Sequence, residues 1–144
     1  MRYAILVTTA LVLAAGTARA QPPCTNHLLN DDYGVQISGT RPSVPGPLAP
    51  TELVVGTAMG HFDGRGGYTQ VGSTHGAVSG VTSGTPGTGS YVVNPDCTGV
   101  ITFQNAGQPF PIEVAIVVVG QGDEVKGATT SPAGIMVTAV WRKR

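Results

Sequence analysis

Apolar and polar side chains alternate along most of the chain after residue 32, with the period of two that a half-buried β-strand shows. In the first such run, Tyr33, Val35 and Ile37 fall on one face. Helical periodicity is almost absent beyond residue 20. The predicted strands cover residues 33–40, 52–62, 68–80, 88–93, 98–104, 111–119, 124–129 and 135–141.

Turn residues separate these runs. Residues 63–67 read DGRGG, and such Asp-Gly and Gly-Gly pairs supply the positive φ that tight hairpins need. Residues 41–50 hold four prolines, which favours an extended loop over a central strand. We expect a further loop at residues 81–86, where Ser, Thr, Gly and Pro dominate, and a hairpin turn at residues 94–97.

About eight sequential strands with short connections predict an all-β fold, an antiparallel barrel that leaves no sheet edge exposed. A two-sheet β-sandwich is the alternative architecture for the same pattern. The interior of a barrel of this size is either filled by side chains or just able to hold one small ligand. The sequence does not decide between a filled and a hollow interior. Tyr33, Tyr68 and Trp141 are candidates to line a ligand pocket.

Glu113 interrupts the most apolar predicted strand, residues 111–119. If Ile112, Val114 and their partners at the same spacing fill the interior, Glu113 is outside and solvated. If Glu113 points inward instead, it is a buried carboxylate with a raised pKa and a candidate acid or base. Its place near the strand end favours the solvated alternative.

Residues 1–20 have the features of a secretory signal peptide. Arg2 precedes an apolar run that falls short of the roughly 20 residues a membrane span needs, and Ala18-Arg19-Ala20 fits the cleavage site. We therefore expect one β-barrel domain over residues 21–144, exported to the periplasm or the extracellular medium. After signal cleavage, we expect no transmembrane segment.

Composition agrees with an exported all-β domain. Only 11% of residues are charged, glycine numbers 21, and eight basic residues balance eight acidic ones. No basic stripe points to nucleic acid, because the one cluster is Arg142-Lys143-Arg144 at the C-terminus. The sequence carries no signal for an oligomeric state.

Two segments resemble motifs of a group of small exported bacterial proteins of largely unknown function. FDGRGG, residues 62–67, resembles their F-D-G-x-G turn, and GSYVVNPDCTGVITF, residues 89–103, resembles their G-x-Y-x-V-x-x-D-C-T-G segment. The resemblance implies an architecture similar to calycin and allene oxide cyclase-like barrels, a class that binds apolar molecules. No catalytic motif of those cyclases maps onto this chain.

Cys24 and Cys97 are the only cysteines. An even count in an oxidising compartment favours a disulfide between them, and a cysteine nucleophile would need a base that no pattern supplies. The histidines lack the usual metal-ligand spacings, and counting about the 63–67 turn pairs His61 with Thr69 rather than His75. We expect no metal and no cofactor.

Two hypotheses about function follow. The first is a disulfide-stapled barrel without catalytic activity, which holds a small apolar ligand in its lumen. The second is a cyclase or isomerase of the allene oxide cyclase-like type, with Glu113, His61 and Tyr91 as candidate catalytic residues. An open cavity of at least about 300 Å³ with convergent polar groups would support a small-molecule site.

Overall fold

The structure is a computed structural model that describes residues 22–44 and 49–144. The expected signal peptide and part of the proline-rich loop lie outside the described residues. Two short 3-10 helices, η1 (Asn26–Leu28) and η2 (Gly120–Gly122), accompany the strands. The strands are β1 (Asn30–Pro42), β2 (Thr51–Asp63), β3 (Gly67–Gly76), β4 (Gly80–Val93), β5 (Thr98–Asn105), β6 (Ile112–Val119), β7 (Glu124–Ser131) and β8 (Met136–Lys143).

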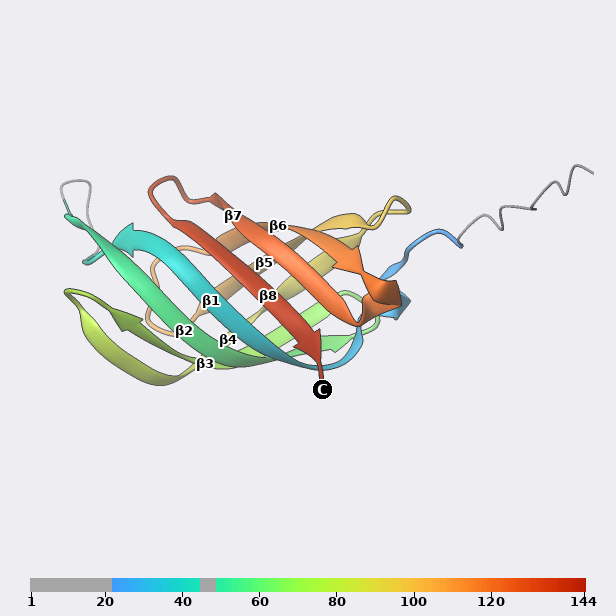
Figure 1. Cartoon of the computed structure of the whole chain (residues 1–144), viewed down its shortest axis with the longest axis horizontal. Coiled ribbons are helices and arrows are strands. Elements are labelled where there is room, and N and C mark those ends of the chain that lie inside the picture. Colours follow the sequence, from blue (N-terminus) through green and yellow to red (C-terminus); the bar gives the residue numbers. More distant parts are fainter. Residues whose placement is uncertain (1–21, 45–48) are drawn as a thin grey trace, which may run out of the picture.

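The eight strands form one closed barrel in sequence order (Figure 1). Each strand pairs antiparallel with the next, and β8 returns to β1, where Val35 lies opposite Trp141. The predicted antiparallel barrel is confirmed, and closure of the sheet excludes the sandwich alternative. Figure 1 shows the connections gathered at two ends, with the described N-terminal segment at one of them.

The period-two pattern decides which side chains face the lumen. Val114, Ile116 and Val118 of β6 are buried, and so are Tyr33 and Val35 of β1. In β2 the alternation places the odd-numbered apolar residues, Leu53 and Val55 among them, on one face, and this face is exposed. The opposite face, with the even-numbered residues Val54 and Phe62, is buried.

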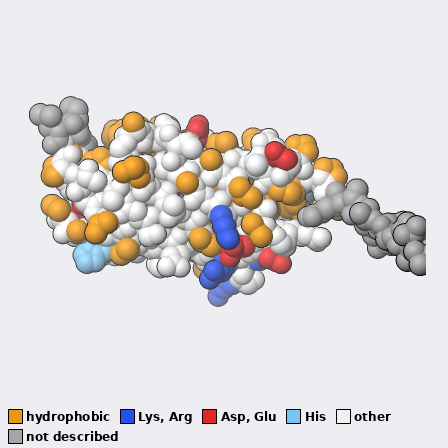
Figure 2. Space-filling view, turned by 45° about the horizontal axis from the view of Figure 1, so that its top comes forward, with side chains coloured by type: hydrophobic (Ala, Val, Ile, Leu, Met, Phe, Trp, Pro, Cys, Tyr) orange, Lys and Arg blue, Asp and Glu red, His pale blue; other side chains and the backbone are white. Residues whose placement is uncertain are grey.

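Apolar side chains also lie scattered over the outer surface, where Figure 2 shows them among polar groups on the face drawn. Those exposed by half or more include Leu53, Val55, Val71, Val81 and Met136. Exposed apolar residues in this arrangement are ordinary for a folded protein.

One half of the barrel is solid because four aromatic rings fill it. Phe62 is fully buried, and its ring centroid lies 5.2 Å from that of Tyr33, 4.8 Å from Tyr68 and 4.9 Å from Tyr91. We call these four residues the aromatic cluster. Edge-to-face and tilted contacts of this kind add to the free energy gained from burial alone.

Residues 22–29 cover this solid end. The disulfide between Cys24 and Cys97 ties the segment to the β4–β5 turn, with the two Cα atoms 5.0 Å apart. The Asn26 side chain accepts a hydrogen bond of 2.7 Å from the Val93 amide. The Tyr91 hydroxyl donates to the carbonyl oxygen of Leu29 at 2.8 Å, so the segment is held at several points.

The prediction of a loop at residues 81–86 is wrong, because these residues form the first half of β4. They pair with β3, while pairing with β5 begins only at Gly87 opposite Asn105. This stretch is therefore paired with another strand on one side only, and most of its side chains are exposed. Without a buried face there is no apolar alternation for sequence reasoning to detect.

Candidate functional site

The other half of the barrel is hollow. A cavity of about 310 Å³ lies in the lumen between the aromatic cluster and the end that carries the β5–β6 connection. Its wall is mainly apolar, with Val35, Ile37, Val54, Ala58, Phe103, Ile112, Val114, Ile135, Val137, Ala139 and Trp141. Its polar lining comprises Arg41, Gln70, Thr74, Thr82, Thr85, Asn105, Gln108 and Thr129.

Side-chain size explains why this half is open. Inward positions near the solid end carry tyrosine and phenylalanine, whereas Ala58, Gly72 and Ala139 occupy inward positions around the cavity. Small residues at successive wall positions leave volume that neighbouring strands of a closed barrel cannot collapse to fill. The cavity also reaches exposed residues of the β5–β6 connection, among them Ala106 and Gly107.

A continuous hydrogen-bond network crosses the floor of the cavity. Trp141 Nε1 donates to the Tyr68 hydroxyl at 3.0 Å, and that hydroxyl donates to Gln70 Oε1 at 2.8 Å. Gln70 Nε2 then donates to Asn105 Oδ1 at 2.9 Å. We call these four residues the lumen network. Gln70 is only 9% exposed, which makes it one of two buried polar or charged side chains among the described residues.

Burial raises the pKa of the Tyr68 hydroxyl far above its ordinary value, so it keeps its proton and remains a donor. A Cβ atom added at Gly60 would lie 3.0 Å from that hydroxyl and 3.4 Å from Trp141 Cδ1. Gly60 therefore leaves the space in which the Trp141–Tyr68 hydrogen bond forms.

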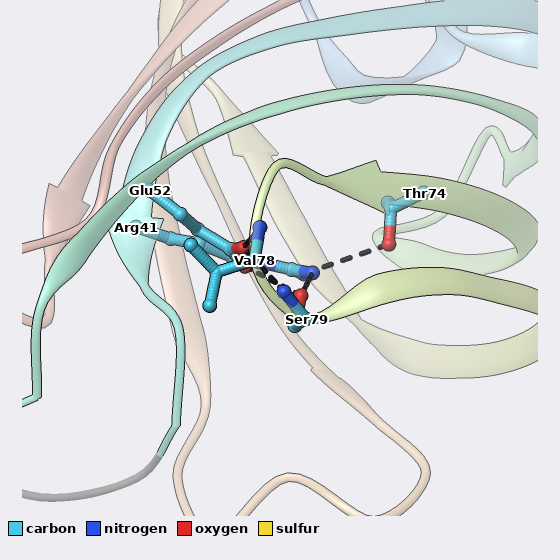
Figure 3. Close-up of polar contacts among 5 residues, drawn as sticks. All are labelled: Arg41, Glu52, Thr74, Val78 and Ser79. Atoms are coloured by element: carbon cyan, nitrogen blue, oxygen red, sulfur yellow. Dashed lines mark hydrogen bonds and ion pairs between the residues drawn. The ribbon is translucent and has the colours of Figure 1, made fainter.

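A second polar group joins two hairpins at the open half, drawn in Figure 3. Glu52 is 3% exposed, and its Oε1 accepts hydrogen bonds from Arg41 Nε at 3.0 Å and from the Ser79 hydroxyl at 2.6 Å. Its Oε2 accepts from the backbone amides of Val78 and Ser79, each at 2.8 Å. Arg41 also reaches Ser79 Oγ at 3.1 Å and Thr74 Oγ1 at 3.5 Å. These five residues are the Glu52 cluster.

Hydrogen bonds to the charged form dominate the electrostatics of this cluster. Donors from the Ser79 side chain and backbone, from Val78 and from Arg41 lower the pKa of Glu52 to about 2, against the opposing effect of burial. The carboxylate is thus ionised at neutral pH, and it neutralises the Arg41 guanidinium that lines the cavity.

The three candidate catalytic residues do not meet. Glu113 is exposed on the outer face of β6, where its carboxylate accepts a hydrogen bond of 2.9 Å from Thr130 Oγ1. His61 is exposed on the outer face of β2, with Nδ1 2.8 Å from Asp32 Oδ1. Tyr91 is buried at the solid end, away from the cavity lining.

Of the three residues expected to line a pocket, Trp141 borders the cavity directly. Tyr68 is not part of the cavity lining, but its hydroxyl contacts Trp141 and belongs to the lumen network. Tyr33 is fully buried in the aromatic cluster, and its hydroxyl donates to the carbonyl oxygen of Gly122 at 2.6 Å.

The register places His61 opposite Thr69, while His75 lies opposite Val55. Within residues 22–44 and 49–144, no group of three His, Cys, Asp or Glu side chains is arranged to hold a metal ion. Over the same part of the chain, none of the helices is long and apolar enough to cross a membrane.

Sequence reasoning missed Gln70, Asn105 and Arg41. A usable signal was present for two of them, because Gln70 follows Tyr68 by two positions and Asn105 follows Phe103 by two. Residues two positions apart on a strand point to the same face, so a polar residue two positions from an inward aromatic residue also faces the lumen. For Arg41, the surrounding prolines hid the continuation of β1 as far as Pro42.

The arrangement offers an apolar container with amide and hydroxyl groups at its floor and sides. The part of the cavity lining that the structure describes includes no Asp, Glu, His, Lys or Cys side chain. Comparison with known proteins found no matching family model, no matching curated protein and no matching solved structure.

Proposed function

We propose that this protein is an exported binding protein whose barrel lumen holds one small, mainly apolar molecule. The observation that carries the proposal is the cavity of about 310 Å³, which falls at the lower end of the roughly 300–1,000 Å³ typical of small-molecule sites. Apolar walls with a few placed polar groups are the usual composition of such sites.

Binding is favoured over catalysis by the chemistry of the lining. General acid–base catalysis needs a titratable group within hydrogen-bond reach of the substrate. Glu113 and His61 lie on the outside of the barrel, and Arg41 is paired with Glu52. A cyclase of the allene oxide cyclase-like type, the alternative, would have to act through the shape of the lumen and its amides alone.

Export and membership of the calycin-like class are parts of the same proposal. The disulfide supports export, because Cys24 is 3% exposed and disulfides persist in oxidising compartments. The closed barrel supports the likeness to calycin and allene oxide cyclase-like barrels at the level of architecture.

Trp141 is the only tryptophan and borders the cavity, so its fluorescence reports directly on occupancy. The test titrates the protein with butylbenzene and with 4-phenyl-2-butanone and follows Trp141 emission. Native mass spectrometry of the protein purified from exporting cells detects any molecule retained in the lumen. We expect a saturable change in emission with at least one probe.

Two Ala→Phe variants separate the lumen from the surface. Ala58 lines the cavity, and Ala58→Phe should fill it and weaken binding at least about tenfold, the equivalent of about 1.4 kcal/mol. Ala128 is exposed on β7, and Ala128→Phe should leave binding unchanged. Absence of both a saturable response and a retained molecule, or equal binding by the two variants, would contradict the proposal.

A further inference from the structure

We propose that the cavity selects uncharged molecules that carry a hydrogen-bond acceptor oxygen, such as a ketone, aldehyde, ester or ether, and that Asn105 Nδ2 donates to that oxygen. This inference rests on the proposed binding function and adds the chemical class of the ligand. The carrying observation is the direction in which the hydrogen bonds of the lumen network run.

The indole of Trp141 fixes that direction, because its Nε1–H is a donor and cannot accept. The Tyr68 hydroxyl therefore accepts from Trp141 at 3.0 Å. Among the described residues, Gln70 Oε1 is the one acceptor for its single proton, 2.8 Å away. The Gln70 atom that receives this proton must be Oε1, so its amide nitrogen faces Asn105.

The direction of donation is the same at the end of the network. Gln70 Nε2 donates to Asn105 at 2.9 Å, so the Asn105 atom in contact is Oδ1. Among the hydrogen bonds of the described residues, none uses Asn105 Nδ2. The network thus ends in an amide NH₂ group at a half-buried residue that lines the cavity.

Each step of the network also strengthens the next donor. A hydrogen bond accepted by an amide carbonyl polarises the amide and makes its N–H groups better donors. Gln70 is polarised by Tyr68, and Asn105 is polarised by Gln70. An acceptor on a ligand therefore meets a donor that is fixed in place and enhanced in strength.

The backbone is shaped to present these two amides. Gln70, Gly87 and Asn105 occupy one row across β3, β4 and β5, since Gly87 lies opposite both of the others. A Cβ atom at Gly87 would lie 2.5 Å from Asn105 Oδ1 and 3.1 Å from Gln70 Cγ. The glycine leaves the gap across which the two side chains bond.

The charge of the lining favours a neutral ligand. Arg41 is the one charged residue among the described residues of the lining, and Glu52 neutralises it at 3.0 Å. A carboxylate buried beside Asn105 would lose its hydration without gaining a free cation, which is costly. A neutral carbonyl oxygen needs only the hydrogen bond that Asn105 supplies.

The test compares three probes of matched shape: 4-phenyl-2-butanone, butylbenzene and 3-phenylpropanoate. Dissociation constants come from Trp141 emission and from isothermal titration calorimetry. In the wild type, we expect the carboxylate to bind at least about tenfold more weakly than the ketone, because its charge is not compensated.

Asn105→Leu removes the donor. We expect ketone affinity to fall by about fivefold or more, since its oxygen would be buried without a partner, while butylbenzene affinity is unchanged or higher. Asn105→Ala serves the same purpose without added bulk, should the Leu variant fail to fold. Gln36→Leu makes the matched amide-to-leucine change on the exposed face of β1 and should alter neither affinity.

The outcomes distinguish this inference from the function on which it rests. Selective loss of ketone affinity in the Asn105 variants supports it. If both uncharged probes bind and the Asn105 variants leave their affinities unchanged or weaken them equally, the inference about Asn105 is overturned and the binding function stands. The same holds if the carboxylate binds as tightly as the ketone. Failure of all three probes to bind the wild type would overturn this inference, and it would overturn the binding function too if native mass spectrometry also finds no retained molecule.

Discussion

Arg41 and Glu52 face each other across the paired ends of β1 and β2, and Arg41 Nε lies 3.0 Å from Glu52 Oε1. The same carboxylate accepts hydrogen bonds from Val78 and Ser79 in the β3–β4 turn. The buried Glu52 carboxylate therefore links the β1–β2 hairpin to the β3–β4 hairpin, in addition to the pairing of β2 with β3.

Acid should release this junction in a defined pH range. The folded pKa of Glu52, about 2, lies below its ordinary value of 4.5. Its contribution to the free energy of unfolding is therefore fully present above about pH 4.5 and is lost as the pH falls toward 2. Urea unfolding of the wild type and Glu52→Gln should show a stability difference at pH 7 that shrinks over this range.

Glu113→Gln provides the matched control, because it makes the same substitution on the exposed face of β6. At pH 7 it should change the free energy of unfolding by no more than about 0.5 kcal/mol. A stability difference between wild type and Glu52→Gln that stays constant from pH 7 to pH 2 would contradict the role assigned to the Glu52 carboxylate.

Alkali should act on Tyr33 at the opposite end. Burial, as the largest cause, raises the pKa of its hydroxyl to about 12 from an ordinary value of 10.0. The neutral hydroxyl thus stabilises the fold below about pH 10, and this contribution is lost as the pH rises toward 12. Phenolate absorbance, measured as the difference between wild type and Tyr33→Phe, should show this late ionisation.

At neutral pH, Tyr33→Phe should lower the free energy of unfolding by about 1–3 kcal/mol, because the Gly122 carbonyl loses its buried donor. Chemical denaturation measures the change. Equal stability of variant and wild type would mean that the carbonyl finds another partner.

Reduction of the disulfide should destabilise the barrel without closing the cavity. Cys24 and Cys97 are 73 positions apart, and a loop of that size corresponds to about 4 kcal/mol in the chain-entropy model. Urea unfolding with and without dithiothreitol measures the loss. The double variant Cys24→Ser, Cys97→Ser should have the stability of the reduced wild type, and dithiothreitol should not change it. A wild-type unfolding midpoint that dithiothreitol does not move would refute the expectation.

Phe62 should be among the most sensitive positions in the solid half. It contacts three tyrosine rings and is fully buried, so Phe62→Ala should cost about 3–5 kcal/mol through lost burial and the cavity left behind. Thermal unfolding measures this. Thr57→Ala, on the exposed face of the same strand, should change stability by no more than about 0.5 kcal/mol.

The fold was largely predictable because burial leaves a trace in the sequence. Val114, Ile116 and Val118 alternate with outward residues, so β6 and the inward direction of its side chains follow from pattern alone. Residues 81–86 were missed for the complementary reason. They pair with β3 alone and most of them are exposed, so hydrogen bonding to β3 holds them in a strand without any apolar periodicity.

The cavity was less predictable, because it depends on side-chain volumes summed around a closed ring. Nothing local to Ala58 or Ala139 says that both border the same empty space, since they come from β2 and β8. Trp141 was expected to line a pocket only as one of several aromatic candidates. The direction of the lumen network could not be read in advance, because it depends on contacts among β3, β5 and β8.

The division of the barrel into a solid and a hollow half separates positions that hold the fold from positions that shape the cavity. The aromatic cluster and the disulfide lie at one end, whereas Val137 and Asn105 border the cavity and lie outside the main apolar core. Under the proposed binding function, substitutions at Val137 or Asn105 would change which ligand fits while the barrel stays folded. These two wall positions are therefore the places to begin when engineering the barrel for a different ligand.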